Sequence, residues 1–197
     1  MSMAENDDRP IVLAACGASG QIYARWLLKL LLERGRRVHL IVSREVNAIC
    51  ADELGIPELT YELPDQTLEV HENDSMESPL ASGSYSTAGM IVCPCTLNTL
   101  AAVSTGISDN LVKRAAQVHL KQRRPLVLAV REMPLSLIDL ENMVRLARAG
   151  AYVSPLAPSF YHHPKTIDEL TRYTAERLIA LVADHELSFR YDGNREC

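Results

Sequence analysis

The chain has 197 residues, of which 47% are hydrophobic and 23% charged, and its formal net charge is −5. This length fits one soluble domain with a substantial core, and the acidic balance without a long basic run argues against a nucleic-acid-binding surface. No apolar stretch is long enough to span a bilayer, and the polar, acidic start of the chain differs from a signal peptide. Five cysteines without the spacing of a disulfide framework indicate a reducing, cytoplasmic compartment.

Short apolar runs alternate with segments of helical periodicity along the chain. The runs predict buried strands at 11–15, 38–42, 90–93, 126–130 and 151–153, with a weaker strand at 68–70. The helical segments lie at 21–34, 44–54, 94–105, 110–121 and 136–149, with a final long helix that begins at Thr166. This alternation predicts one doubly wound, mostly parallel α/β sheet of Rossmann-like type over residues 11–185, between disordered tails at 1–10 and 186–197.

Small polar residues follow three of the predicted strands. Gly17-Ala18-Ser19-Gly20 follows the first strand, Ser43 the second, and Thr96 the strand that ends at Cys93. Because parallel strands end at one edge of their sheet, we expect these residues to share that edge. A glycine turn before a helix can bind a phosphate through its amides, although a plain tight turn and simple N-capping by Thr96 explain the same residues.

A pair of charged residues follows the most apolar of the predicted strands. Arg131-Glu132-Met133-Pro134 comes directly after the run 126–130, and Pro134 should end strand pairing there. Charged groups at this position suit a ligand pocket, and a structural ion pair between Arg131 and Glu132 is the competing interpretation.

Several other polar residues have ordinary explanations. Glu53 on a predicted helix is expected to be a solvated charge, and Arg114 and Lys121, seven residues apart, should share a solvent-facing helical side. In the final helix, Thr166 and Glu169 predict a capping box, and Arg177 flanks an apolar stripe where an arginine usually pairs with an anion. We place that stripe at Leu170, Thr174, Leu178 and Leu181.

The sequence offers no convincing metal-ligand set. Cys93-Pro94-Cys95 has a single intervening residue and no second ligand pair near it, and His162-His163 lacks matching ligands. The central histidine, His71, is assigned to a loop. We therefore expect no metal.

A series of short motifs, in order from about Ile11 to Leu181, resembles the UbiX-type flavin prenyltransferases. The motifs are Gly17-Ala18-Ser19-Gly20, Ser43, Ala81-Ser82-Gly83-Ser84, Cys93-Pro94-Cys95-Thr96, Asp109-Asn110-Leu111, Arg114-Ala115-Ala116, Leu120-Lys121-Gln122-Arg123-Arg124-Pro125, Arg131-Glu132-Met133-Pro134, Glu141-Asn142-Met143 and Pro158-Ser159-Phe160-Tyr161-His162-His163-Pro164. Each motif is weak alone, and their ordered combination is specific. Ser75 and Tyr191 stand where the family often has tryptophan.

The resemblance implies a reaction. Members of that family join the dimethylallyl group of dimethylallyl monophosphate to N5 and C6 of reduced FMN without a metal, and the prenylated FMN serves a UbiD-type decarboxylase. The resemblance also implies a homo-oligomer, a dodecamer with its active sites between subunits. Membrane and nucleic-acid partners are not implied.

The same resemblance assigns roles to individual residues. It implies that FMN is bound by Gly17, Ala18, Ser19, Ser43, Thr96, Leu97, Asn98, Thr99, Arg114 and Arg131. It implies that the prenyl phosphate is bound by Ser84, Lys121, Tyr161 and Arg177. Catalytic roles fall to Ser19, Glu53, Lys121 and Glu132.

Two other functions remain open at this stage. An FMN-dependent peptidyl-cysteine decarboxylase has a similar Pro-x-x-x-Asn-Thr segment, here Pro94 to Thr99, but needs a catalytic histidine and a Pro-x-Met-Asn motif. A non-catalytic flavin carrier would have no evident use for Lys121, Glu132, Tyr161 and Arg177.

Overall fold

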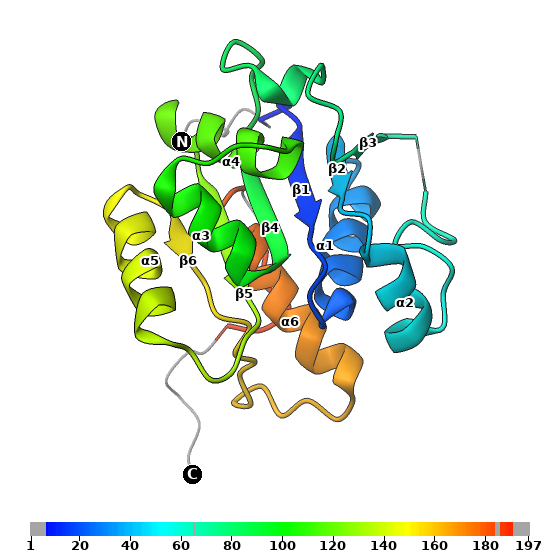
Figure 1. The fold of residues 1–197 in the computed structure, drawn as a ribbon. Coiled ribbons are helices and arrows are strands. Elements are labelled where there is room, and N and C mark those ends of the chain that lie inside the picture. The colour runs from blue at the N-terminus through cyan, green and yellow to red at the C-terminus, as the bar shows by residue number, and fades with distance from the viewer. Residues whose placement is uncertain (1–6, 65, 184–185, 191–197) are drawn as a thin grey trace, which may run out of the picture.

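A computed structural model describes residues 7–64, 66–183 and 186–190. The predicted tails fall partly outside these residues, as do Tyr191 and Cys197. The strands are β1 (Ile11–Ala15), β2 (Val38–Val42), β3 (Leu68–Glu72), β4 (Gly89–Cys95), β5 (Leu126–Val130) and β6 (Tyr152–Val153). The helices are α1 (Gln21–Glu33), α2 (Val46–Leu54), the 3₁₀ turn η1 (Pro79–Ala81), α3 (Leu97–Thr105), α4 (Leu111–Lys121), α5 (Leu137–Arg148) and α6 (Ile167–Ile179) (Figure 1).

The strands form one six-stranded sheet in the order β3-β2-β1-β4-β5-β6. Every pairing within it is parallel, which confirms the predicted doubly wound sheet. The chain moves outward in one direction from β1 to β3 and in the other from β4 to β6. The direction therefore reverses between β1 and β4, and open sheets of this kind bind ligands at the carboxyl ends of the strands at that reversal.

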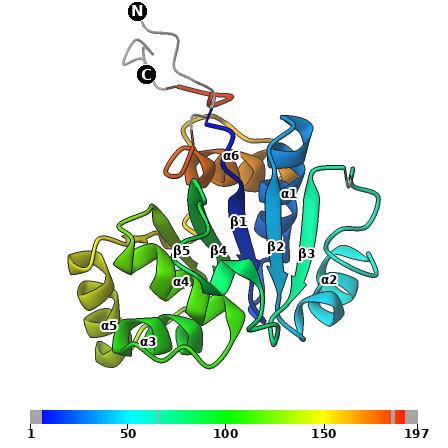
Figure 2. The same ribbon diagram turned by 90° about the horizontal axis from the view of Figure 1, so that it is seen from above.

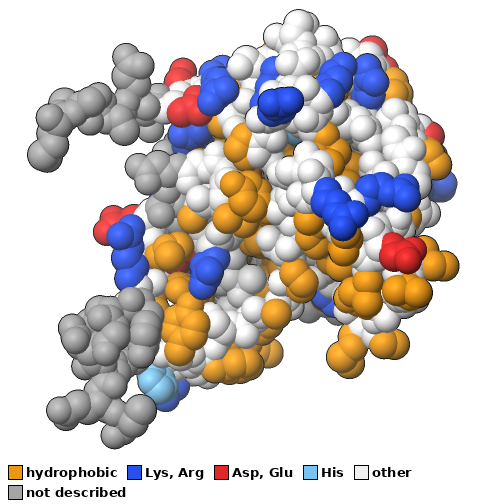
Figure 3. All heavy atoms as spheres, turned by 90° about the vertical axis from the view of Figure 1, so that its left-hand side faces the viewer, with side chains coloured by type: hydrophobic (Ala, Val, Ile, Leu, Met, Phe, Trp, Pro, Cys, Tyr) orange, Lys and Arg blue, Asp and Glu red, His pale blue; other side chains and the backbone are white. Residues whose placement is uncertain are grey.

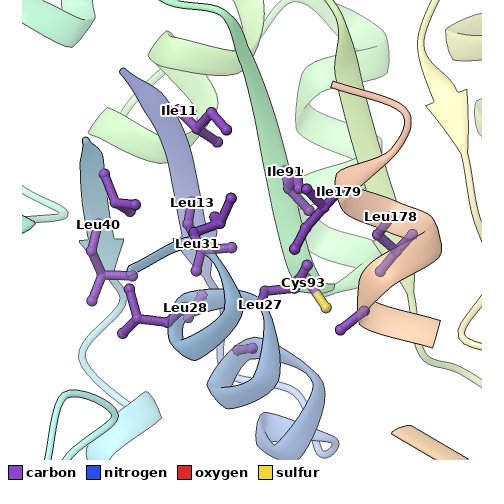
Figure 4. Packing of buried hydrophobic residues seen from close by; sticks show 14 of the residues in the cluster. Ile11, Leu13, Leu27, Leu28, Leu31, Leu40, Ile91, Cys93, Leu178 and Ile179 are labelled. Atoms are coloured by element: carbon purple, nitrogen blue, oxygen red, sulfur yellow. The ribbon is translucent and has the colours of Figure 1, made fainter. Parts of the chain in front are cut away.

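Two hydrophobic layers cover the sheet. Residues Ile11, Leu13 and Ala15 of β1 face α1, α2 and α6, and the intervening residues Val12 and Ala14 face α3, α4 and α5. Figure 2 shows α1 and α6 on one side of the sheet and α3, α4 and α5 on the other. The close view in Figure 4 shows leucines of α1 meeting the strands beside Leu178 and Ile179 of α6. Burial on both faces explains why the central strands read as unbroken apolar runs.

The predicted helix starts are largely confirmed. Thr96 caps α3 and Asn110 caps α4, each accepting a hydrogen bond from a backbone amide three residues later. Thr166 accepts from the amide of Glu169 at the start of α6. The reciprocal half of the predicted capping box is wrong, because the Glu169 carboxylate accepts from the amide of Lys165 and not from Thr166.

Three other details differ from the predictions. The buried stripe of α6 runs through Thr171, Ala175, Leu178 and Ile179, whereas Leu170 and Thr174 are only half-buried. Strand β4 continues to Cys95, beyond the predicted Cys93. His71 lies inside β3 and is not a loop residue. Among the described residues, no helix is long and apolar enough to cross a membrane.

His119 is an ionisable side chain that the fold buries completely between α4 and the start of β4. It is 1% exposed, its Nδ1 lies 2.7 Å from the Ala115 carbonyl, and its Nε2 lies 2.9 Å from the Thr87 hydroxyl. Burial lowers the pKa of His119 to about 4, although the Ala115 carbonyl opposes this effect. The ring is therefore neutral at pH 7, with Nδ1–H donating to Ala115 and Nε2 accepting from Thr87.

We expect the folded protein to lose stability as the pH falls from about 6.5 toward 4, because the unfolded chain protonates His119 first. Between pH 7 and pH 5, the unfolding free energy should fall by about 2 kcal/mol because of His119. Urea unfolding at both pH values measures the loss, and a His119→Gln variant should show a correspondingly weaker pH dependence. His163→Gln, which changes an exposed histidine, should behave like the unmodified protein; an unchanged slope in His119→Gln would contradict the prediction.

Candidate active site

The turn after β1 lies between the ends of its two neighbouring strands. The Ser43 amide donates to the carbonyl of Ala15 at 3.0 Å, and the Cys16 amide donates to the carbonyl of Pro94 at 3.3 Å. Ser43 and the residues before Thr96 are thereby held on either side of the glycine turn. The expected gathering of these segments at the carboxyl edge is what the structure shows.

The start of α1 already holds an anion, which is a carboxylate of the protein itself. Glu53 of α2 accepts from the amide of Gly20 at 2.9 Å and from the amide of Gln21 at 3.0 Å. These two amides are therefore not free for a phosphate. Burial would raise the pKa of Glu53, but hydrogen bonds from the Ser19 hydroxyl and from these amides outweigh it, so the pKa is lowered. Glu53 is thus an ionised, positioned carboxylate and not the freely solvated charge that its sequence suggests.

Arg131 and Glu132 separate at the end of β5. Arg131 Nε donates to the carbonyl of Ser19 at 3.2 Å, and its charge contributes to lowering the Glu53 pKa. Glu132 turns the other way and accepts from the amide of Met133 at 3.1 Å. No ion pair joins Arg131 to Glu132 in the described structure, so the competing interpretation of a structural pair is wrong.

The polar side chains at the start of α3 point partly into the protein and partly toward solvent. Thr99 is buried, and its hydroxyl lies 3.0 Å from the Thr96 hydroxyl and 3.6 Å from the Cys16 thiol. Asn98 is exposed and Leu97 is half-buried. Thr96 and Asn98 are therefore the polar side chains best placed to meet a ligand here, while Thr99 holds α3 against the β1 turn.

Ser43 Oγ and Gln21 Oε1 are the two buried polar atoms of the site without a hydrogen-bond partner among the described residues. Ser43 lines a cavity of about 690 Å³ at the ends of β2 and β3, together with Arg44, Asn47 and Thr60. Gly17 lies beside this cavity, where an added Cβ would come within 3.0 Å of Glu45 Cβ. The Glu45 side chain thus packs on the Gly17 backbone, and the buried Ser43 hydroxyl without a partner is the feature that fits a polar ligand.

Arg114 and Lys121 of α4 line a second, open cavity of about 660 Å³ with Ser82, Gly83 and Ser108. Arg114 Nε donates to the Ala81 carbonyl at 3.0 Å. The predicted solvent-facing side of α4 thus lines a groove with Arg114 and Lys121, the basic groove, against the segment Ala81-Ser82-Gly83-Ser84, the serine loop. Ser84 is exposed beside the basic groove, with its hydroxyl 2.9 Å from that of Ser82.

Tyr161 and Arg177 form a separate group on α6 and the loop before it. Arg177 donates to the Tyr161 hydroxyl at 3.0 Å, and that hydroxyl lies 2.9 Å from the hydroxyl of Tyr173. Hydrogen bonding to Tyr173 and then to Arg177 lowers the pKa of Tyr161. Both Tyr161 and Arg177 remain exposed.

The sheet separates this group from the basic groove. Ala175, Leu178 and Ile179 of α6 pack on the α1 side, whereas Ala115 and Ala116 of α4 pack on the opposite side. Figure 2 shows the two helices on opposite faces. Within one chain, Lys121 and Arg177 therefore do not converge.

Two supporting residues were missed by the sequence reasoning. Gln21 is fully buried, and its amide nitrogen donates to the carbonyls of Cys16 and Ala18 at 2.8 Å each, which fixes the glycine turn. Arg124 donates to the carbonyls of Gly83 and Tyr85 and holds the serine loop. The sequence does not indicate these roles. Gln21 is only the first residue of a predicted helix, and Arg124 is one of several basic residues in a short stretch.

Comparison with known proteins gives a consistent result. The model of the family described as Flavoprotein matches residues 2–179. The chain is 40% identical over 182 residues to the flavin prenyltransferase UbiX of Pseudomonas aeruginosa, covering 86% of this chain and 87% of that protein.

Solved structures agree with the sequence comparison. A structure of AnUbiX (PadA1) in complex with FMN and dimethylallyl pyrophosphate has a TM-score of 0.83 and 37% identity, over 88% of this chain and 92% of that one. A dodecameric FMN-dependent UbiX-like decarboxylase from Escherichia coli O157:H7 has a TM-score of 0.81 and 36% identity, over 87% and 93%.

We expect Glu53→Ala to lower the unfolding free energy by about 1 kcal/mol, because it removes the only carboxylate bound to the amides at the start of α1 among the described residues. Chemical denaturation at neutral pH measures the change. Asp52→Ala, at the exposed neighbouring position of α2, is the matched control and should stay close to the unmodified protein. Equal stability of the two variants would show that the Glu53 contacts do not stabilise the fold.

Proposed function

The chain belongs to the Flavoprotein family and, within it, to the flavin prenyltransferases, and from this we propose that it transfers the dimethylallyl group of dimethylallyl monophosphate to N5 and C6 of reduced FMN. The observation that carries the proposal is the carboxyl-edge site: Ser19, Glu53 and Arg131 are joined there by hydrogen bonds and charge beside the orphaned Ser43 hydroxyl.

The residues of this edge fit FMN. The unpartnered Ser43 Oγ offers a hydrogen bond to a polar group of the flavin. We assign flavin binding to Gly17, Ala18, Ser19, Ser43, Thr96, Leu97, Asn98 and Arg131, with Thr99 supporting them from inside. Since Glu53 occupies the α1 amides, we place the flavin phosphate away from that helix start.

Reduced FMN, when bound, supplies nucleophilic N5 and C6 atoms. The chain supplies the proton transfers around them. Glu53 is ionised and hydrogen-bonded to Ser19, so it is the group suited to accept the proton lost from C6. Glu132 is exposed at the end of β5 and accepts only from its own neighbour's amide among the described contacts. In its protonated form it could donate that proton to the leaving oxygen of the prenyl phosphate.

Cationic residues would drive the departure of phosphate. Breaking the allylic C–O bond leaves its electron pair on the phosphate, and positioned cations stabilise that charge. Lys121 and Arg114 form one such group beside Ser84, and Arg177 with Tyr161 forms another. We assign Ser84, Lys121, Tyr161 and Arg177 to the prenyl phosphate, and we keep Arg114, which lines the same cavity as Lys121, as a residue that binds FMN.

These two groups can meet at one phosphate only if different copies of the chain contribute them, because the sheet lies between them in each copy. An exposed apolar face supports such an assembly. Its members are Met133, Leu137, Ile138, Leu140, Val144 and Tyr152, which are 46% to 88% exposed. Figure 3 shows hydrophobic side chains spread over this α5 side of the molecule. We propose a homo-oligomer, of dodecameric form as in the similar E. coli protein.

The alternative functions are not favoured. A cysteine decarboxylase would need a catalytic histidine beside the flavin. His71 is instead buried in β3, where it contacts His39 and Ser78. A passive carrier leaves two sets of phosphate-binding cations unexplained. We further propose a UbiD-type decarboxylase as recipient of the product. The free thiols of Cys16, Cys50, Cys93 and Cys95 support a cytoplasmic location.

The function is tested by mass spectrometry of the flavin. The protein, incubated with reduced FMN and dimethylallyl monophosphate without oxygen and with a chelator present, should yield FMN that carries one added five-carbon unit. Dimethylallyl pyrophosphate in a parallel reaction measures the preference between the two phosphates. Unchanged flavin mass, with both ligands shown to bind, would refute the proposal, and carbon dioxide release from a peptidyl cysteine would instead support the decarboxylase.

A shared phosphate site is tested with mixed oligomers. Lys121→Ala and Arg177→Ala chains should each retain less than about a tenth of the activity, because each variant removes one cation from every site. Oligomers formed by co-expressing the two should recover about a quarter of the unmodified activity, since random mixing places both intact residues together at that share of sites. If both residues acted within one chain, the mixture would be no more active than the single variants.

A further inference from the structure

We propose that His39, Glu69 and His71 form a binding site for a divalent cation of the zinc class, separate from the flavin edge. The three residues come from neighbouring strands, His39 from β2 and the other two from β3. In the parallel register His39 lies opposite Glu69, and His71 follows two residues later on the same face of β3. Strand pairing thus assembles a ligand set from positions 32 residues apart in the chain.

The ligand atoms have the spacing of a metal site. His39 Nδ1 lies 2.9 Å from His71 Nε2. Glu69 Oε2 lies 3.3 Å from His39 Nδ1, and Glu69 Oε1 lies 3.4 Å from His71 Nε2. Ligand atoms around tetrahedral zinc are about 3.3 Å apart, because each lies about 2.0 Å from the metal. An increase of a few tenths of an ångström between the imidazoles would therefore accommodate the ion.

The outer nitrogen of each imidazole is also held. His39 Nε2 lies 2.8 Å from the Tyr85 hydroxyl, and His71 Nδ1 lies 3.2 Å from the Ser78 hydroxyl. Such outer partners fix the ring orientation and the tautomer of histidines that bind metals. With both outer nitrogens donating to the hydroxyls, the two facing nitrogens would direct lone pairs at the same point.

Burial and access also suit a bound ion. His39 and His71 are 6% and 9% exposed, so both imidazoles are sheltered from solvent on the protein side of the site. The Glu69 side chain is 61% exposed and supplies negative charge from the solvent side. A cavity of about 280 Å³, lined by His39, Glu69 and Tyr85, leaves room for water as a fourth ligand.

The position of the site suggests what the ion would stabilise. Ser78 and Tyr85 begin and end the segment that contains Ser82 and Ser84, beside the basic groove. An ion on the histidines would therefore join the outer edge of the sheet to the serine loop, with no direct part in prenyl transfer.

The experiment is a zinc titration of the full-length protein after chelator treatment, against a competing chelating dye. We expect one zinc ion per chain, and at least a tenfold loss of affinity in Glu69→Gln and His71→Ala. Tyr85→Phe keeps all three ligands and should weaken binding about tenfold by releasing the outer nitrogen of His39. Because Glu69 is exposed, its variant tests the site even if a histidine variant fails to fold.

Two controls match these changes. Glu72→Gln alters the same strand on its other face, and His163→Ala removes an exposed imidazole elsewhere; both should bind zinc like the unmodified protein. Anomalous X-ray scattering from zinc-loaded crystals should place the ion between His39 and His71. The proposal is overturned if Glu69→Gln and Glu72→Gln bind zinc equally, if no stoichiometric binding is seen, or if the scattering lies elsewhere.

Discussion

In a sheet whose strands all run the same way, every strand ends at one edge, and the proposed chemistry depends on that constraint. Backbone hydrogen bonds between the segments that follow β1, β2 and β4 bring Ser19, Ser43 and Thr96 together. Arg131 joins them by bonding the Ser19 carbonyl from the end of β5. The strand order reverses between β1 and β4, which is where open parallel sheets bind ligands.

The sequence predicted what depends on local pattern. The buried run 126–130 and the cap at Thr96 were readable because burial on both faces and helix capping each leave a short-range signature. The roles of Glu53 and His71 were not readable, because they depend on contacts between distant elements. Glu53 reaches the start of α1 from the next helix, and His71 meets His39 only through strand register. From its sequence neighbours, Glu53 was predicted to be a solvated charge and His71 to be a loop residue.

The placement of Lys121 and Arg177 underlies the proposal that two copies of the chain share one active site. Lys121 and Arg177 lie on opposite sides of the sheet, and both side chains are exposed. If both residues bind the prenyl phosphate, as proposed above, an isolated copy offers them on opposite faces of its sheet. Association of copies through the exposed apolar side chains of α5 would be favourable, because it removes apolar surface from water. Assembly and activity would then depend on the same surfaces.

Glu53 has a further consequence for the turnover of the enzyme. Helix starts attract free phosphate, and a vacant one beside the reacting atoms would retain the inorganic product of each cycle. Here the amides of Gly20 and Gln21 are saturated by a carboxylate that cannot diffuse away. A released phosphate approaching α1 meets a negative charge in place of open donors. Because Glu53 already occupies this helix start, we expect the phosphate product to leave the site and not to be retained at α1.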